Sequence, residues 1–441
     1  MRMGECMRFI KVVQLSAIHV AVALTLLPID STLNRIMISE LAIPASLVAL
    51  MIAVPYFLSP MQMWIGSLSE RWPLWGWRRS PYIVIGLLCC AGGAALAPQA
   101  AFAIYEGVWW GIPLGFLAFG TWGMGFNFAT VSYLSLATDL SGPGQRTRVV
   151  GIMWFTLIVS MIIGGIAFAR SIEPYSHERL IVSFEQMSLL ALIIGIAGVI
   201  GLEPRHEGDG SNEPRMGWRQ TWQFVGDNPQ AKQFFVYLIV VLIAILGQDV
   251  LLEPYAADIF AVSPANTTRY TSMWGGALLI GLLVTNRLST RFGVKGAAGI
   301  GAVVAASGLS LIVAAGLTHR VELLIPGLVV FGFGSGIATA SNLALMLDMT
   351  IAGQVGVFIG AWGVADALAR LGGTLLSGVI RDVVMYGLGS RLAGYVVVFA
   401  IEIALLLWSI WMLRRIQSEQ FQARALQTSE VIGLAGQTQG A

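Results

Sequence analysis

Gly66-Ser67-Leu68-Ser69-Glu70-Arg71 is a short polar stretch that follows a long apolar run. Asn286-Arg287-Leu288-Ser289-Thr290-Arg291 follows a later apolar run in the same way, so that Leu68, Ser69 and Arg71 recur as Leu288, Ser289 and Arg291. Recurrence of a loop after corresponding apolar runs is typical of membrane proteins built from two related halves. The repeat therefore predicts that the chain consists of two related halves.

Composition places the chain in the membrane. Of its 441 residues, 56% are hydrophobic and only 11% are charged, whereas a soluble domain carries about 25% charged residues. The net charge of +2 gives no indication of a nucleic-acid partner. The three cysteines have neither the number nor the spacing of a disulfide framework or a metal site. A polytopic membrane protein is therefore expected.

The apolar runs are long enough to cross the hydrocarbon core, which takes about 20 residues per helix. They are too long for membrane strands and do not alternate, so an all-α protein with twelve transmembrane helices is predicted. The predicted spans are 11–38, 44–68, 80–103, 107–139, 147–170, 182–202, 231–257, 267–289, 293–317, 321–348, 352–380 and 391–414.

A polar linker at 203–230 divides these spans into six and six. The predicted domains are a six-helix bundle at 1–202, this linker, a second bundle at 231–418, and a polar tail at 419–441. Most of the 26 Lys and Arg residues fall into alternate loops on the side of both termini. Because basic loops stay in the cytoplasm, both termini are predicted to be cytoplasmic.

Motifs of enzymes are missing from the sequence. It contains no phosphate-binding loop, no zinc-protease motif and no nucleophile elbow in a suitable context. Membrane prenyltransferases hold magnesium diphosphate with paired aspartate-rich motifs, and no such pair occurs here. We expect neither catalytic residues nor a resident metal.

Two similar polar segments end the first and seventh spans. Asp30 and Asn34 are spaced like Asp249 and Glu253, and a helix would place each pair on one face, one turn apart. Each segment lies about one membrane thickness beyond the basic residue that begins its span, which predicts a position near the outer face. Three roles stay open: interfacial capping or ion pairing with Arg35 and Arg269, an outer gate that also includes Gln248, or direct contact with a substrate.

Two further sites lie within apolar runs. Asp366 and Arg370 are four residues apart, so an intrahelical ion pair is the simplest account, with a cavity-facing functional role as the alternative. His19 is the single histidine within a predicted span. Its imidazole is a packing group, a proton-binding group or a ligand for the magnesium of a chlorin.

The repeated loop and the six-plus-six arrangement resemble the major facilitator superfamily. Its loop pattern is matched after the second span by Gly66, Leu68, Glu70, Arg71, Gly76, Arg78 and Arg79. The copy after the eighth span lacks the acidic residue and has Thr290 there. The resemblance implies two pseudo-symmetric six-helix bundles.

Longer stretches resemble one branch of that superfamily, the PucC/LhaA family. They are TLNRIMISELAIPASLVAL (32–50), WRRSPYI (77–83), YLSLATDL (133–140), RTRVVG (146–151), QDVLLEPY (248–255), TTRYT (267–271) and GVFIGAWGVADALARLGG (356–373). The resemblance implies a factor for light-harvesting assembly in the inner, photosynthetic membrane of a phototrophic bacterium. Bacteriochlorophyll would be its cargo, with antenna polypeptides and pigment-synthesis enzymes as partners.

The chain departs from that family in two places. Members are uncharged where this chain has Asp366 and Arg370, and the loop from Glu70 to Arg78 is shorter here. His19 lies outside the matching stretches, so the resemblance assigns it no ligand role. A proton-coupled exporter of a small metabolite and a pigment-free chaperone of antenna helices are the two alternative functions.

Overall fold

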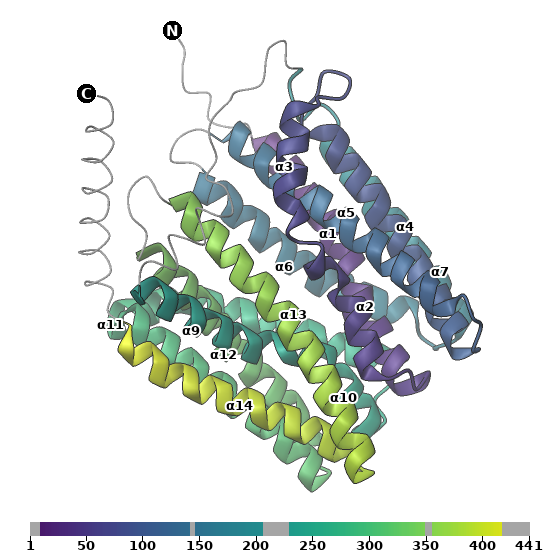
Figure 1. Cartoon of the computed structure of the whole chain (residues 1–441), viewed down its shortest axis with the longest axis vertical. Helices are drawn as coiled ribbons and strands as arrows, with labels where there is room; N and C mark the ends of the chain where they lie inside the picture. The colour runs from purple at the N-terminus through teal and green to yellow at the C-terminus, as the bar shows by residue number, and fades with distance from the viewer. Residues whose placement is uncertain (1–8, 142–145, 206–228, 349–354, 417–441) are drawn as a thin grey trace. The chain divides into compact units, whose positions relative to one another are not determined.

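A computed structural model of the chain describes residues 9–141, 146–205, 229–348 and 355–416. Within these ranges the regular structure is helical, apart from an isolated β-bridge between Leu74 and Trp77 (Figure 1). The all-α prediction is confirmed. Most of the predicted linker and tail lie outside the described residues.

The helices of the first part of the chain are α1 (Phe9–Pro28), α2 (Ala45–Phe57), α3 (Met61–Arg71), α4 (Ser80–Tyr105), α5 (Gly111–Leu140), α6 (Arg146–Ser171) and α7 (His177–Val199), with π-helical turns η1 (Ile29–Leu33) and η2 (Ile36–Glu40) after α1. The later helices are α9 (Pro229–Leu246), α10 (Leu252–Phe260), α11 (Pro264–Thr318), α12 (Leu324–Asp348), α13 (Val355–Leu388) and α14 (Arg391–Arg415), with 3₁₀ turns η3 (Gly247–Val250) and η4 (Val321–Leu323).

The described residues include nine helices that are long and apolar enough to cross a membrane. One of them, α11, covers two predicted spans, which meet at Gly293. Gly293 has φ +73°, a conformation that glycine adopts at little cost and that interrupts the helix. The prediction of multiple membrane crossings is confirmed, while the number twelve stays a prediction.

Several predicted spans are not single regular α-helices, among them 44–68 and 231–257. Residues 44–68 form α2 and α3, which a turn through Pro60 separates. Residues 231–257 form α9, the 3₁₀ turn η3 and then α10. The assumption of one regular helix through Asp249 and Glu253 was therefore wrong, because these residues lie in η3 and α10. A change of helix type between two residues changes the face on which each lies.

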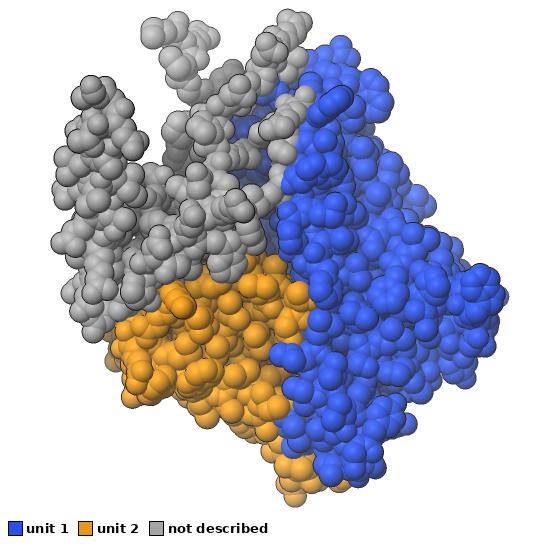
Figure 2. Space-filling view, in the orientation of Figure 1, with its two compact units in different colours: residues 1–212, 249–276, 374–397 blue, residues 213–248, 277–373, 398–441 orange. Residues whose placement is uncertain are grey.

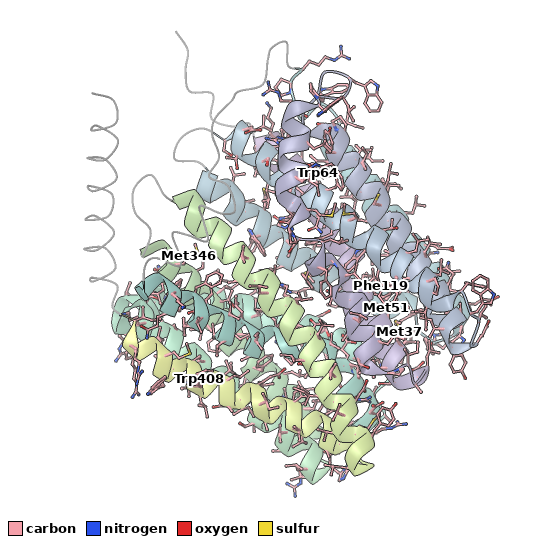
Figure 3. The ribbon with its side chains drawn as sticks, in the orientation of Figure 1. Met37, Met51, Trp64, Phe119, Met346 and Trp408 are labelled. Carbon is pink, nitrogen blue, oxygen red and sulfur yellow. The ribbon has the colours of Figure 1, made fainter. Side chains whose placement is uncertain are left out.

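Small residues allow α4 and α5 to pack with their backbones close together. A Cβ on Gly93 would lie 2.4 Å from the backbone nitrogen of Trp122, and one on Gly125 would lie 2.5 Å from that of Cys90. Such contacts are typical of helix pairs in membranes, where small residues let helices approach. Figure 3 labels Met37 in η2, Met51 in α2 and Phe119 in α5, and all three side chains are buried.

The chain forms two compact units (Figure 2). Unit 1, in blue, comprises residues 1–212, 249–276 and 374–397, and unit 2, in orange, comprises residues 213–248, 277–373 and 398–441. Unit 1 thus includes two segments from the second half of the sequence. The predicted division into bundles at 1–202 and 231–418 stays a prediction.

Candidate functional site

A band of polar contacts in unit 1 joins the segment 30–40 to the segment 249–271, and we call it the polar seam. The Asn34 side chain donates from Nδ2 to the Val250 carbonyl at 2.8 Å, and Arg35 donates from Nη2 to the Val262 carbonyl at 2.7 Å. The Oγ of Ser39 donates to the Pro254 carbonyl at 3.3 Å. The predicted gate residues Asn34 and Arg35 therefore contact the segment that follows α9.

Hydroxyl groups extend the seam into the buried interior of unit 1. The Oγ1 atoms of Thr32 and Thr268 lie 2.7 Å apart, and both side chains are fully buried. Because hydroxyls both donate and accept, this contact keeps two buried polar groups satisfied. The seam thus links residues that are 215 to 236 positions apart in the sequence.

Interruptions of the helices explain why backbone carbonyls are available to the seam. Val250 ends η3, and Val262 follows the end of α10, where Ala261 has φ +53°. Carbonyl groups at the end of a helix have no partner within that helix and accept from side chains or water. The side chains of Asn34 and Arg35 supply those donors.

Two carboxylates accompany the seam. Glu253, in the first turn of α10, is 6% exposed and forms a hydrogen bond with the Thr271 hydroxyl. Arg35 also binds the Glu40 carboxylate. Burial, and then the negative charge of Glu40, raise the pKa of the nearby Tyr175 hydroxyl. The phenol therefore stays protonated beside the Arg35–Glu40 pair.

The remaining residues predicted for this region have different surroundings. Arg269 forms an ion pair with Glu173 at 2.7 Å, and Arg35 binds Glu40, so pairing of these arginines with Asp30 or Asp249 stays a prediction. Gln248 belongs to unit 2, where its side chain donates to the Ile245 carbonyl at 3.3 Å.

A second charged cluster in unit 1, which we call the Arg381 network, escaped the sequence analysis. Arg381 is 3% exposed and donates to Asp382 at 2.9 Å and to Asp258 at 3.1 Å. The Tyr395 hydroxyl donates to the same Asp258 carboxylate at 2.7 Å. Asp382 in turn accepts from the backbone nitrogen of Ser46 at 2.8 Å, near the start of α2. A carboxylate is favourable there because helix N-termini carry positive partial charge.

Sequence reasoning placed Arg381 in a loop outside the eleventh span, at 352–380. The helix α13 instead continues to Leu388, so Arg381 lies within it and is buried. The neighbouring opposite charges of Arg381 and Asp382 were the single available signal in the sequence. Asp258 and Tyr395 are too distant in the chain to be recognised as their partners.

The third cluster, the loop network, surrounds the polar loop after α3. The Glu203 carboxylate accepts from the backbone nitrogens of Arg78, Arg79 and Ser80 at 2.7 to 3.1 Å, which satisfies the start of α4. The Arg79 side chain is buried, donates to Ser69 and lies 3.5 Å from Asp139. The motif positions Arg78 and Arg79 thus help to form a fixed turn.

Other residues of the loop motif give less information. Leu68 is half-buried in α3, while the side chains of Glu70 and Arg71 lie outside the described part of the structure. A functional role for the loop motif stays a prediction. Its acceptor Glu203 was counted as part of the linker.

His19 is a packed side chain, 4% exposed. Its ring centroid lies 5.1 Å from that of Tyr133 and 5.5 Å from that of Trp154, whose ring stands edge-on. Its Nδ1 atom is buried and has no hydrogen-bond partner among the described residues. A chlorin would reach this ring only if a neighbouring side chain moved away, so the ligand role stays a prediction.

The predicted ion pair of α13 is confirmed. Arg370 donates from Nε to Asp366 at 3.0 Å, and both side chains are about one third exposed. Across the described ranges, no group of three or more His, Cys, Asp or Glu side chains is arranged to hold a metal ion.

Comparison with known proteins identifies the relatives of this chain. A family model described as "PUCC protein" matches residues 32–421. The chain belongs to the PUCC protein family. It is 31% identical to the protein PucC of Cereibacter sphaeroides, with 94% of each chain covered. It is 27% identical to a protein of Rhodobacter capsulatus called the bacteriochlorophyll synthase 44.5 kDa chain, with 85% of this chain and 88% of the relative covered.

Solved structures identify the fold of this PUCC family member. A bacterial homologue of the human lysosomal transporter Spinster superposes with a TM-score of 0.74 at 14% identity, over 95% of this chain and 98% of the other. The fold is therefore that of the major facilitator transporters, as predicted. The protein is a multi-pass, transporter-like membrane protein with relatives in photosynthetic bacteria.

Proposed function

We propose that this protein handles bacteriochlorophyll for light-harvesting antenna polypeptides in the inner membrane of a phototrophic bacterium, without catalysing a reaction. The match of the PUCC family model over residues 32–421 carries the proposal. Pigment-synthesis enzymes would supply the cargo, and the antenna polypeptides would receive it. Both termini would lie in the cytoplasm, on the side of the basic loops.

The distribution of charge in the molecule supports an apolar cargo. A chlorin with an isoprenoid tail is mostly apolar. A path for it through the membrane should therefore contain few ionisable side chains, which are costly in such surroundings. Most of the buried charged residues described here belong to the polar seam, the Arg381 network or the loop network, where they have partners. The seam would then act as a gate at one end of the cargo path, held closed by single hydrogen bonds.

Deletion of the gene tests the proposal in the phototrophic host. We expect loss of assembled antenna complexes while pigment synthesis continues, and recovery when the intact chain is supplied in trans. Normal antenna in the deletion strain would contradict the proposal and favour an exporter of another metabolite. Loss of pigment synthesis itself would point to an enzymatic role.

Purification in a mild detergent then tests whether the protein holds pigment. The absorption spectrum of the purified protein should contain the bands of bacteriochlorophyll, and a His19→Leu variant tests whether the imidazole contributes. If loss of the gene abolishes antenna but no chlorin copurifies under any mild condition, the pigment-free chaperone replaces the pigment carrier.

A further inference from the structure

Glu253 is a buried acidic residue whose surroundings cargo handling does not explain. Its carboxylate is buried in α10, against the segment that contains η1 and η2. One oxygen, Oε1, is hydrogen-bonded to the Thr271 hydroxyl, and the hydroxyls of Ser31 and Thr267 lie beside the same carboxylate. The other oxygen, Oε2, has no hydrogen-bond partner among the described residues.

Among the described residues, the surroundings of Glu253 supply hydroxyl groups, and the arginines Arg35 and Arg269 are each bound to another carboxylate. Arg35 is the cation that acts on Glu253, and its terminal nitrogens already bind Glu40 and the Val262 carbonyl. Arg269, on α11, is paired with Glu173. The other charged residues on the elements around it, Asp30 in η1 and Asp249 in η3, are acids like Glu253 itself. An ionised carboxylate in such a place would be costly, and buried acids of this kind take up a proton.

A proton would also make Glu253 a donor to a neighbouring group. The Ser31 Oγ is buried beside the Glu253 carboxylate. A protonated Oε2 becomes a donor, and a serine hydroxyl accepts as well as donates. One proton on Glu253 therefore lets its buried Oε2 atom donate a hydrogen bond to a neighbouring hydroxyl.

We propose that Glu253 is a proton-binding site of the polar seam: its carboxyl group holds a proton while the seam is closed and releases it to water when the seam opens. Closing would take the proton up again, so that the seam is more stable at low pH. This role is independent of the nature of the cargo. The seam would thereby be sensitive to the proton concentration on the side to which it opens.

Infrared spectroscopy of the full-length protein in lipid nanodiscs tests the site directly. At neutral pH the wild-type protein should show the carbonyl band of a protonated carboxylic acid, which disappears on transfer to alkaline buffer. The Glu253→Gln variant, which keeps the shape of the protonated acid, should lack that band. The control Glu178→Gln removes an exposed carboxylate in the first turn of α7 and should leave the band unchanged.

A second variant keeps the proposal testable if Glu253→Gln does not accumulate. Thr271→Val removes the hydroxyl bound to Glu253 with little change in shape, so the band should move to higher frequency. A band that persists in Glu253→Gln, or that does not move in Thr271→Val, would overturn the assignment. Neither readout requires pigment, so failure here is separate from failure of the proposed cargo.

Discussion

The polar seam and the loop network are both buried sets of hydrogen bonds in unit 1, yet they connect different parts of the sequence. The seam joins residues 215 to 236 positions apart, through one hydrogen bond at each of Asn34 and Ser39. The loop network joins residues of the first half alone, and its Glu203 carboxylate accepts from three successive backbone nitrogens. The contacts of the seam are thus separate single hydrogen bonds, whereas those of the loop network converge on one carboxylate.

The polar seam can therefore open while the protein stays folded, whereas the loop network cannot open without local unfolding. A single hydrogen bond contributes about 1 kcal/mol, so the seam can be broken step by step. A buried carboxylate that caps a helix stabilises one particular turn, and its loss exposes several donors together. We therefore expect substitutions in the seam to change opening and substitutions in the loop network to change stability.

The largest effect should come from the Arg381 network, because it joins distant parts of the sequence and also concentrates several buried bonds on one charged group. Arg381→Met would remove the buried cation that the Asp258 and Asp382 carboxylates share. Removing one partner of a buried ion pair costs about 3–5 kcal/mol, so little folded protein should accumulate. Yield after membrane extraction and the melting temperature in detergent measure this effect.

Arg391→Met is the matched control for that substitution. Arg391 lies 3.9 Å from the same Asp258, but its side chain is 62% exposed. Exposed ion pairs contribute little, so this variant should melt close to the wild type. Equal losses in both variants would show that the Arg381 network is not a special point of stability.

The loop network should give the next largest effect. Glu203→Ala removes the acceptor of three backbone groups at the start of α4 and should cost about 0.5–2 kcal/mol, as for other helix caps. A lower melting temperature with unchanged hydrogen exchange in residues 250–262 is expected. Glu185→Ala, at an exposed position, serves as the control. Faster exchange at 250–262 in Glu203→Ala alone would remove the distinction between the two regions.

The seam itself should give a smaller change in stability and a clear change in opening. Asn34→Ala removes the bond to the Val250 carbonyl, which is worth about 1 kcal/mol. That loss increases the open population roughly five-fold, since 1.4 kcal/mol corresponds to about ten-fold. Hydrogen exchange followed by mass spectrometry should show faster exchange at 250–262. Unchanged protection there would mean that Asn34 does not hold the seam closed.

The fold was predictable because it follows from the pattern of apolar and polar residues along the sequence. The polar clusters depend on which distant residues meet in the folded protein, and the sequence does not show this. The apolar runs predicted helices without any tertiary information. The loop repeat predicted a transporter-like fold, since Leu68 and Arg71 recur as Leu288 and Arg291. The partners of Asn34 are backbone carbonyls, which every residue possesses, so no residue type reveals them. The Arg381 network brings together Ser46 and Asp382, which are 336 positions apart.

Local helix geometry limited the prediction of the acidic pairs. The four-residue spacing of Asp249 and Glu253 was interpreted with the period of an α-helix, but the chain changes from a 3₁₀ turn to an α-helix between them. Glu253 consequently faces Thr271, and its importance could be recognised only from its burial. The spacing of Asp366 and Arg370 predicted their ion pair correctly because α13 is regular there.

The smallest loss of stability is expected at the Asp366–Arg370 pair in unit 2. The size of this loss distinguishes a pair that faces water from one that faces lipid. Both side chains are about one third exposed. If that exposed surface meets water in a cavity, Asp366→Asn should cost less than about 0.5 kcal/mol, as for other exposed pairs. If it meets lipid, an Arg370 that has lost the Asp366 carboxylate would cost up to about 2.5–3.5 kcal/mol at mid-membrane. We expect the small value, measured as a nearly unchanged melting temperature, with Asp366→Asn/Arg370→Gln as the control. A large loss in the single variant that the double variant restores would instead place the pair against lipid and make it a structural bond like those of the loop network.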